Sequence, residues 1–550
     1  MRGNSYVPFM LRRGDGSTLS LDFTTMSSLD SRFTFSRSSP ATFINSSGLV
    51  QYANANIIRH SENCASWGGA QNITPTSDAA TAPNGTQTAD QLNLVASSYR
   101  YQTTSTTNAV GARYVGSIWM RTVSGTASVG FRIANAITGS NSSIATCNVT
   151  ETWQRFNTPS FTLTDTANRQ IDIGVDQRSI VSGPNVAANI YVWGLQLQPG
   201  ASVGEYLPTT TTEDYSVPRF DYDPSTLAPR GLLIEGSATN LMTYSEDFNA
   251  AAWTDTSITR ATGNADPAGG TTAVRFTASA GNATVIRAAA IGTSAERTFS
   301  VWLRRVTGTG NIQYTQNNGT NWTTQAITST WTRYTFTHTV DHRVGIRIVT
   351  SGDAIEMWGA QLETGSGASS YIPTGASTVQ RAADSCVMTG TNFSSWFTSD
   401  GTFYYEFDNS RRVVTSANPT PIALGQYAAG DLVGILMNNG NVGSGASMTV
   451  WGSGGTGLQQ QTITSGSTVA TGNKAAFAFS VSGKTGMGAL RNGISAATTT
   501  TGTVNAKTIL FIGGSGSGTS VVRDWLDAPI QRIKFFPVQM TSAQLQALTA

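Results

Sequence analysis

The chain contains few charged residues, few histidines and few cysteines, and each scarcity excludes a class of protein. Lysine and arginine together number 34 and aspartate and glutamate 32, which leaves a net charge of +2 over 550 residues. A chain so close to neutral lacks the basic surface with which proteins attract nucleic acid. Neither a phosphate-binding loop, nor a Gly-x-Ser-x-Gly motif, nor a cluster of histidine and cysteine occurs. The sequence therefore predicts no nucleic-acid partner and none of the common nucleotide, serine-hydrolase or metal sites.

Cysteine usage argues against a disulfide framework. The three cysteines, Cys64, Cys147 and Cys386, are odd in number and lie far apart in the sequence. Disulfide-stabilised domains carry even sets of cysteines at short spacings. We expect all three to be buried free thiols that behave as small apolar side chains.

Long apolar runs, heptads and collagen triplets are also absent. No stretch approaches the roughly 18 apolar residues of a membrane-spanning helix. Residues 1–13 contain no apolar run long enough for a signal peptide. Without heptads or Gly-X-Y triplets, the sequence predicts no fibrous stem. We expect a protein that is made without an export signal and is not inserted in a membrane.

What the sequence does contain is one domain twice. Four blocks recur in the same order, namely Ser117–Arg121 as Ser300–Arg304, Thr152–Phe156 as Thr330–Tyr334, Trp193–Leu197 as Trp358–Leu362, and Glu205–Thr209 as Ser370–Thr374. The offset between the copies shrinks along the chain, as expected when framework strands are joined by loops that tolerate deletion. We therefore expect Trp119 to superpose on Trp302, and Trp193 on Trp358.

The local pattern is that of an all-β protein. Thr, Ser, Gly, Val and Ile are abundant, and short strands of alternating polarity recur at intervals of roughly 8–15 residues. The pattern predicts tandem β-sandwiches, which are two duplicated jelly rolls followed by a third sandwich of another type. The predicted boundaries are a lead segment at 1–57, repeat 1 at 58–215, a linker at 216–230, repeat 2 at 231–384 and the third sandwich at 385–550.

The lead segment and the linker are expected to lie outside the sandwiches. Residues 1–57 carry Phe33, Phe35 and Phe43 but are too few to bury them alone. We expect this segment to attach the protein to another chain or to pack on the first sandwich. The linker has prolines at 218, 224 and 229, which interrupt a hydrogen-bonded ladder, so it is predicted to be an extended connector.

Several segments resemble bacteriophage virion proteins of the tail-fibre, head-spike and baseplate type. The resemblance rests on Ser20–Tyr52, on Pro218–Pro224 with Gly231–Leu241, and on the end of the chain from Ile509 to Leu548. It implies that both repeats are jelly rolls of the carbohydrate-binding-module type. It also implies that the third sandwich is a concanavalin A-like, or laminin-G-like, domain. The first repeat stands where proteins of this class run on directly, and so looks like an insertion.

The resemblance implies a non-enzymatic virion protein that adheres to glycans on the host surface. An architectural alternative stays open, in which the chain decorates a capsid or scaffolds a tail and binds other virion proteins. In both cases the implied location is the virion, assembled in the host cytoplasm, with the lead segment contacting other virion proteins. Weak sugar sites gain from multivalency and virion projections are symmetric, so we expect a homo-oligomer, a trimer before a dimer, with the third domain distal.

The third sandwich carries only half of a glycosidase motif. Concanavalin A-like glucanases place two glutamates on one strand face as nucleophile and acid/base. Glu406 and Asp408 supply the first part of that motif, but the acid/base position is Arg411. A guanidinium does not donate a proton at neutral pH. We expect no catalytic residues and no enzyme activity.

The second repeat has oxygen ligands where lectin-like jelly rolls often hold a structural calcium ion. Glu246 and Asp247 begin the repeat, and Gln361 and Glu363 lie on its last strand. Carboxylate and amide oxygens are the ligands that Ca²⁺ prefers. A structural calcium is the only cofactor that the sequence suggests, and ordinary capping and solvation explain the same residues.

Aromatic residues that occur in only one repeat are the best candidates for sugar binding, because shared aromatics are expected in the framework. Sugar binding needs a planar side chain on the surface, flanked by amides and carboxylates. The unshared aromatics of the first repeat are Tyr99 and Tyr101, and those of the second are Tyr314 and Trp322. Four amide side chains lie between the second pair in the sequence, namely Gln316, Asn317, Asn318 and Asn321. The second group is also typical of an Asn-Gly hairpin tip that turns the chain or packs on a neighbouring subunit.

Overall fold

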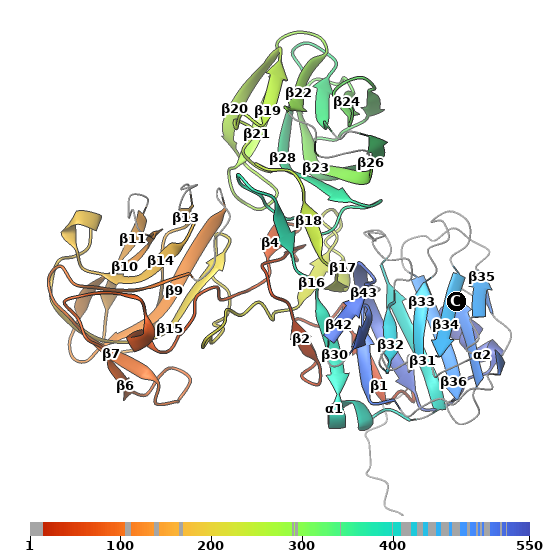
Figure 1. The fold of residues 1–550 in the computed structure, drawn as a ribbon, viewed down its shortest axis with the longest axis horizontal. Helices are drawn as coiled ribbons and strands as arrows, with labels where there is room; N and C mark the ends of the chain where they lie inside the picture. The colour runs from red at the N-terminus through yellow and green to blue at the C-terminus, as the bar shows by residue number, and fades with distance from the viewer. Residues whose placement is uncertain are drawn as a thin grey trace, which may run out of the picture.

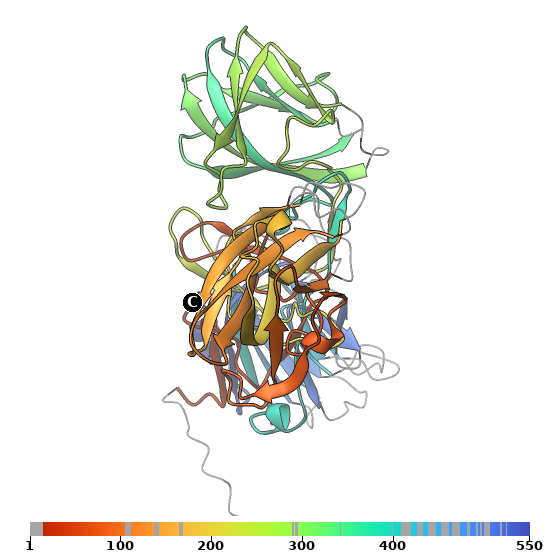
Figure 2. The same cartoon turned by 90° about the vertical axis from the view of Figure 1, so that its left-hand side faces the viewer.

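The protein is built almost entirely from β-strands. A computed structural model describes residues 15–550 except for 105–111, 137–141, 164–168, 289–290, 292–294, 341–342, 399, 409–419, 426–432, 438–446, 453–460, 465–472, 481–484, 491–492, 495–497, 500–506, 518–519 and 524. The described residues form three β-sandwiches, which are separate lobes in Figure 1 and confirm the predicted fold class. The second sandwich projects upward in both views (Figures 1 and 2), and its Asp266 pairs with Arg113 of the first sandwich at 3.6 Å. Within the described residues, no helix is long and apolar enough to cross a membrane.

The first sandwich packs a five-stranded sheet against a six-stranded sheet. The five-stranded sheet has the order β11–β10–β14–β8–β5 and contains β5 (Gly69–Gln71), β8 (Tyr99–Thr103), β10 (Ala127–Asn135), β11 (Ser142–Val149) and β14 (Ile171–Asp176). The other sheet contains β6 (Thr76–Ala80), β7 (Ala89–Leu94), β9 (Arg113–Thr122), β12 (Gln154–Asn157), β13 (Phe161–Thr162) and β15 (Ala188–Pro199), and short 3₁₀ turns lie at η1 (Cys64–Ser66) and η2 (Ser179–Val181). Since side chains alternate along each strand, Phe131 of β10 and Ile118 of β9 face the core that the two sheets share.

The second sandwich repeats this plan. One sheet contains β19 (Trp253–Thr256), β22 (Ala283–Arg287), β24 (Ile312–Thr315), β25 (Thr323–Gln325) and β27 (Gly345–Ile348), and the other contains β20 (Ile258–Asn264), β21 (Ala273–Ala278), β23 (Ala295–Thr307), β26 (Thr332–Val340) and β28 (Ala354–Thr364). Trp119 lies opposite Trp193 on β9 and β15, and Trp302 lies opposite Trp358 on β23 and β28. The strand register therefore confirms the duplication.

The third sandwich gathers strands from three distant parts of the chain. Its larger sheet contains β1 (Leu19–Asp22), β16 (Arg219–Tyr222), β17 (Pro229–Ile234), β31 (Asp400–Phe407), β36 (Asn473–Ser480), β37 (Thr485–Leu490), β38 (Gly493–Ile494), β39 (Thr498–Thr499) and β43 (Ala528–Phe536). The facing sheet contains β2 (Thr34–Ser36), β30 (Ser385–Thr389), β32 (Ile422–Leu424), β33 (Val433–Met437), β34 (Ser447–Gly452), β35 (Gln461–Thr464) and β40 (Ile509–Ile512). The remaining elements are β3 (Thr42–Ile44), β4 (Val50–Tyr52), β18 (Ala238–Asn240), β29 (Val379–Arg381), β41 (Ser515–Ser517), β42 (Ser520–Arg523), α1 (Gly390–Ser394) and α2 (Ser542–Thr549).

The lead segment is part of the third sandwich, which differs from the expectation that it packs on another chain or on the first sandwich. Strand β1 pairs with β43, and β2 pairs with β30. Phe23, Phe33 and Phe35 lie in the core of the third sandwich. The physical reason is that the open edges of β43 and β30 complete their ladders with strands from the N-terminal part of the chain. Figure 1 shows the red β1 and β2 among the blue strands of this lobe.

The predicted linker is a β-hairpin rather than an extended connector. Strands β16 and β17 pair with each other, and β17 also pairs with β43. Pro218 precedes β16, Pro224 lies in the turn and Pro229 is the first residue of β17. These are positions where a missing N–H does not break the ladder. Both repeats are consequently insertions into the third sandwich, the first between β4 and β16 and the second between β17 and β30.

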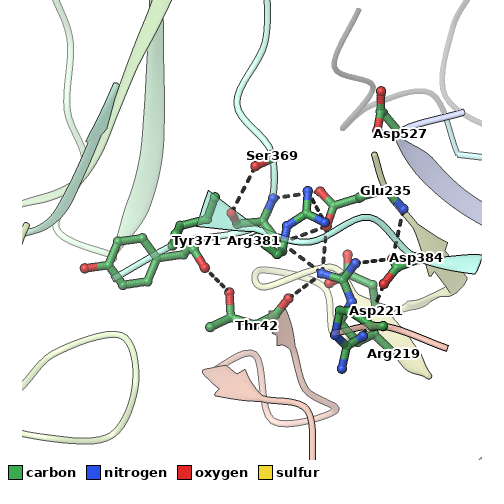
Figure 3. A network of polar contacts seen from close by, with 12 residues as sticks. Thr42, Arg219, Asp221, Glu235, Ser369, Tyr371, Arg381, Asp384 and Asp527 are labelled. Carbon is green, nitrogen blue, oxygen red and sulfur yellow. Dashed lines mark hydrogen bonds and ion pairs between the residues drawn. The ribbon is translucent and has the colours of Figure 1, made fainter. Parts of the chain in front are cut away.

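Buried charges join the points where the chain passes between sandwiches (Figure 3). Arg219 on β16 donates to Glu235 at 2.6 Å and to Asp384 at 2.5 Å. Arg37 reaches Asp384 at 3.2 Å, and Arg381 reaches Glu235 at 3.6 Å. None of the five side chains is more than 3% exposed. Burial opposes ionisation of Glu235, but the guanidinium groups of Arg381 and Arg219 outweigh it and hold the pKa of that carboxyl below its ordinary value.

The three cysteines are buried and free, as predicted. Burial raises the pKa of Cys147 to about 12 and raises the pKa values of Cys64 and Cys386 as well. A thiol that does not ionise near neutral pH is a poor nucleophile. These residues therefore serve as core side chains.

Candidate functional site

Tyr99 and Tyr101 stand side by side on the solvent-facing side of the five-stranded sheet of the first sandwich. Both belong to β8, and Arg100 between them turns inward and donates to the Cys64 carbonyl oxygen at 2.8 Å. The two tyrosine rings stack, with centroids 5.0 Å apart and 16° between their planes. Both side chains are partly exposed. The pair therefore forms a planar aromatic platform on the surface of the sheet.

Charged side chains from the next two strands lie on the same side of this sheet. Gly174 of β14 is opposite Tyr101, and Arg132 of β10 is opposite Gly174, so these three residues form one row. Asp172 and Asp176 lie two residues to either side of Gly174 and point to the same face. A Cβ at position 174 would lie 2.6 Å from the Tyr101 Cα, which explains the glycine at the centre of the row. Tyr101, Arg132, Asp172 and Asp176 therefore surround Gly174 on this side of the sheet.

Asp176 anchors two guanidinium groups beside the aromatic platform. It accepts from Arg178 at 2.5 Å and from Arg132 at 3.4 Å. The guanidinium carbon of Arg178 lies 4.1 Å from the centroid of the Tyr99 ring, which is a cation–π contact. The hydrogen bond to Asp176 raises the pKa of Arg178. The cations and the ring are thus held in fixed positions before any ligand arrives.

The carboxylate of Asp172 is largely shielded from solvent. It is 7% exposed and accepts from the Thr103 hydroxyl at 2.6 Å. Burial raises the pKa of Asp172, against the opposing effects of Thr103 and Arg132, and burial also raises the pKa of Tyr101. A carboxyl group whose pKa is perturbed by burial beside charged partners is a candidate for a functional site. We call the whole surface the tyrosine face, formed by Tyr99, Tyr101, Arg132, Asp172, Asp176 and Arg178.

Sequence reasoning identified the tyrosines of this face but missed its charged residues. The run from Ile171 to Asp176 alternates apolar and polar residues, with its two acids on one face, which predicts a strand with an acidic side. That signal places Asp172 and Asp176 on one face of a strand, although the structure buries both, at 7% and 2% exposure. The position of this strand beside Tyr101, and that of Arg132 beyond it, is visible only in the fold.

The candidate cluster of the second repeat differs from the expected exposed platform, because two of its members turn inward. Tyr314 stacks on Phe336 with ring centroids 3.7 Å apart. Gln316 is 3% exposed and donates to the Phe336 carbonyl oxygen. Both residues thus contact Phe336 of β26 in the opposite sheet, where they support the core.

The remaining members of that cluster hold a turn. Asn317 accepts hydrogen bonds from a threonine hydroxyl and from the Asn321 N–H, each at 2.9 Å. Asn318 has a φ of 57°, a left-handed conformation that asparagine tolerates. Trp322 is partly exposed, and the guanidinium of Arg347 lies 4.4 Å from its ring centroid. These contacts fit the hairpin-tip interpretation.

The second sandwich does not repeat the tyrosine face. Gly345 lies opposite Ile286 in the same way that Gly174 lies opposite Tyr101. Ile286 therefore takes the place of the second tyrosine. Arg347, two residues after Gly345, stands where the first copy has an acid. The two sandwiches share a framework but present different chemistry on this sheet.

The residues expected to hold calcium form two separate groups. Glu246 accepts from the Tyr371 hydroxyl at 3.0 Å, and Asp247 accepts from a backbone N–H two residues on at 3.1 Å. Glu363 accepts from the Gln361 amide at 2.6 Å. In the part of the chain that the structure describes, no three His, Cys, Asp or Glu residues gather around one point. The structure gives these side chains hydrogen-bonding roles, and the calcium site stays a prediction.

Glu406 of the third sandwich is held by neighbouring side chains. It accepts from Arg532 at 2.5 Å and from the Tyr404 hydroxyl. Asp408 pairs with Arg230 at 3.3 Å. Arg411, at the expected acid/base position, lies outside the described residues.

Comparisons with known proteins give similarity of fold. The chain matches no protein family and no curated protein. Among solved structures, it is similar to the CBM40 of Ruminococcus gnavus IT-sialidase bound to α2,3-sialyllactose, at 12% identity over 28% of this chain and 83% of that chain, with a TM-score of 0.23. It is also similar to the tandem CBM22-1–CBM22-2 of Paenibacillus barcinonensis Xyn10C, at 12% identity over 57% of this chain and 98% of that chain, with a TM-score of 0.23. Likeness of this degree concerns the β-sandwich fold alone.

Proposed function

We propose that this chain is a non-enzymatic adhesion protein that binds polysaccharide through the tyrosine face. The observation that carries the proposal is the partly exposed, stacked pair of Tyr99 and Tyr101 beside the largely buried Asp172 and Arg132 on the outer side of the sheet. A pyranose ring presents C–H groups on its faces and hydroxyls around its edge. The C–H groups pack on the tyrosine rings, while the hydroxyls donate to Asp172 and accept from Arg132.

The spacing of the carboxylates favours binding over hydrolysis. Asp172 and Asp176 are four residues apart on one strand, which places them ~13 Å from each other. Glycosidase carboxylates lie about 5–9.5 Å apart on either side of the scissile bond. Asp176 is also occupied by two guanidinium groups. The face therefore has acceptors and donors for hydroxyls but no carboxylate pair at a catalytic separation.

A glycan array probed with the full-length chain tests the proposal. Tyr99→Ala and Tyr101→Ala each remove an aromatic contact, a loss of roughly 2 kcal/mol for an anchor residue, so binding to the glycan selected by the wild type falls by at least about tenfold. Tyr191→Ala, on the opposite sheet of the same sandwich, is the matched control and keeps wild-type binding. If the chain binds no glycan, or if both tyrosine variants bind as well as the control, the proposal fails.

The setting that we propose is the surface of a bacteriophage virion, with the chain in symmetric copies that make weak sites multivalent. This part rests on the resemblance of Ser20–Tyr52, Pro218–Pro224 and Gly231–Leu241 to virion proteins. An architectural role in the same particle is a second candidate. It is favoured by the partly exposed aromatic side chains Trp119, Trp153, Tyr191 and Tyr206 on the opposite sheet of the first sandwich. Locating the chain in purified particles by electron microscopy tests the setting.

A further inference from the structure

The sheet that carries the repeated tryptophans has the same aromatic outer surface in both sandwiches. We call this surface the tryptophan face. In the second sandwich it consists of Trp302, Trp331, Trp358 and Tyr371, and in the first of Trp119, Trp153, Tyr191, Trp193 and Tyr206. It lies on the sheet opposite the tyrosine face, so the two surfaces of the first sandwich are independent of each other.

The two tryptophan faces agree in their internal geometry. The ring centroids of Trp193 and Tyr206 are 4.6 Å apart, and those of Trp358 and Tyr371 are 4.7 Å apart. Each of these indoles donates to a threonine hydroxyl, at 3.0 and 2.8 Å respectively. Each tyrosine hydroxyl lies beside a serine hydroxyl, at 2.7 and 2.9 Å. We therefore expect the tryptophan face of the first sandwich to bind the same kind of segment as that of the second.

The face of the second sandwich is covered by the β3–β4 hairpin of the lead segment. Ile44 and Val50, which face each other across this hairpin, pack among its aromatic rings. The Val50 N–H donates to the Pro267 carbonyl oxygen at 2.9 Å. Under this cover Trp302 is 4% and Tyr371 is 3% exposed. A small hairpin with two aliphatic side chains is thus a demonstrated occupant of this kind of surface.

The face of the first sandwich has no such cover within the described residues. Every member of its cluster comes from the sandwich itself, between Ala80 and Tyr206. Trp119 and Tyr206 are partly exposed, whereas their counterparts Trp302 and Tyr371 are buried. The same contrast holds for the loop beside each face, where Pro83 of the first copy is exposed and Pro267 of the second is buried. The first copy retains the surface but lacks its occupant.

Charge adds a further requirement for what covers the first face. Arg121 lies over the rings of Trp153 and Tyr191, with 5.4 and 4.3 Å to their centroids. Its counterpart Arg304 has Glu356 directly opposite and pairs with it at 2.5 Å. Tyr191 occupies the position of that glutamate, and no carboxylate in the described part of the chain pairs with Arg121. The surface therefore combines an aromatic floor with a cation that lacks an anionic partner.

We propose that the tryptophan face of the first sandwich is a docking site for a β-hairpin of a partner protein. The hairpin presents two facing aliphatic side chains, as Ile44 and Val50 do, and a carboxylate that pairs with Arg121. The chain's own hairpin does not fill this role, because it is already seated on the second sandwich. The interaction is separate from glycan binding, since the tyrosine face lies on the other sheet.

A cyclised peptide with the sequence of residues 41–53 is the probe, with a benzophenone on residue 52 for photo-crosslinking. Its binding to the full-length chain is measured by titration calorimetry, and the crosslinked residues are located by mass spectrometry. We expect crosslinks on the first sandwich around Trp153 and Tyr191. Tyr191→Ala and Trp153→Ala weaken binding at least about tenfold, as expected when an anchor residue is removed, whereas Tyr99→Ala leaves it unchanged.

Two peptide series complete the test. A peptide with Ile44→Asp and Val50→Asp binds at least about tenfold more weakly if the aliphatic pair is the anchor. In the second series, each of the other positions of the peptide is replaced by aspartate, one at a time. At least one of these peptides binds the chain more tightly than the native peptide does, and Arg121→Gln in the chain removes this gain in affinity. The proposal is overturned if the native peptide does not bind, if its crosslinks lie on the second sandwich, or if the doubly substituted peptide binds equally well. Self-association of the chain that Tyr191→Ala abolishes would instead identify a second copy as the occupant.

Discussion

At the scale of single residues, Asp172 illustrates how a binding surface opposes stability. It is 7% exposed, and this burial raises the pKa of its carboxyl above the ordinary value of 3.8. The folded state therefore holds the proton more tightly than the unfolded chain does, and ionising the group on folding costs free energy. An aspartate that lowers the stability of the folded state in this way is better explained by a role in ligand binding than by a role in packing.

Asp172→Asn is predicted to raise the melting temperature at pH 7 and to weaken glycan binding. For an acid whose folded pKa is raised, stability declines as pH rises through the window that begins at 3.8. The advantage of the asparagine variant should therefore be larger at pH 7 than at pH 3.5, which thermal melts across this range will measure.

Asp223 is the control with the opposite sign. Backbone hydrogen bonds and Arg230 outweigh burial and lower its pKa to about 2. Its contribution to stability is present above 3.8 and declines as pH falls toward the folded value. Asp223→Asn should lower the melting temperature at pH 7. Equal pH profiles for Asp172→Asn and Asp223→Asn would contradict the assignment of the two environments.

At the scale of strands, local pattern was sufficient to predict much of the fold but not the pairing of distant strands. Alternation along Ser117–Arg121 and its copy predicts framework strands correctly, because a strand with one buried face shows alternating polarity in its own residues. The partners of β1 and β2 lie roughly 500 and 350 residues away along the chain. No local property of Leu19–Asp22 identifies β43 as its neighbour, so the lead segment was expected to lie elsewhere.

The same limit explains which part of the binding surface was predicted. Tyr99 and Tyr101 differ between the repeats, and that difference is readable from one sequence. Arg132 contributes through cross-strand register, which depends on how β10, β14 and β8 assemble. In the second repeat, Tyr314 has the same aromatic character but lies on the core-facing side of β24, where it stacks on Phe336 of the opposite sheet.

Removing residues 1–57 is predicted to unfold the third sandwich. The deletion takes away β1 and β2 and exposes a core that Phe23 and Phe35 complete. Phe23→Ala tests the same point in the intact chain, since loss of a buried phenylalanine costs about 3–5 kcal/mol. Val538→Ala is the control, because this side chain is 55% exposed and a surface change costs about 0.5 kcal/mol or less. Chemical denaturation followed by tryptophan fluorescence measures both, and similar midpoints for the two variants would contradict the placement of β1.

At the scale of the whole molecule, two sandwiches are inserted into a third, so the chain crosses between domains at several points. The crossings converge on the buried cluster of Arg37, Arg219, Glu235, Arg381 and Asp384. Such a cluster fixes the relative positions of the crossing segments, because the loss of any one side chain would leave a buried charge without compensation. The third sandwich holds both termini of the described chain, with β1 paired to β43 and α2 packed on β36.

Glu235→Gln is predicted to destabilise the junction strongly at pH 7 and weakly in acid. Removing one partner of a buried ion pair costs about 3–5 kcal/mol, because Arg219 and Arg381 would stay buried with less compensating charge. The folded pKa of Glu235 lies below the unfolded value of 4.5, so its contribution is complete above 4.5 and is lost as pH falls below that value. The gap in melting temperature between wild type and variant should therefore narrow from pH 7 to pH 3. Glu213→Gln, which breaks a more exposed pair with Arg59, is the control and should cost about 0–1 kcal/mol at pH 7. A gap that stays constant with pH, or a variant as stable as the control, would show that the charge of Glu235 does not hold the sandwiches together.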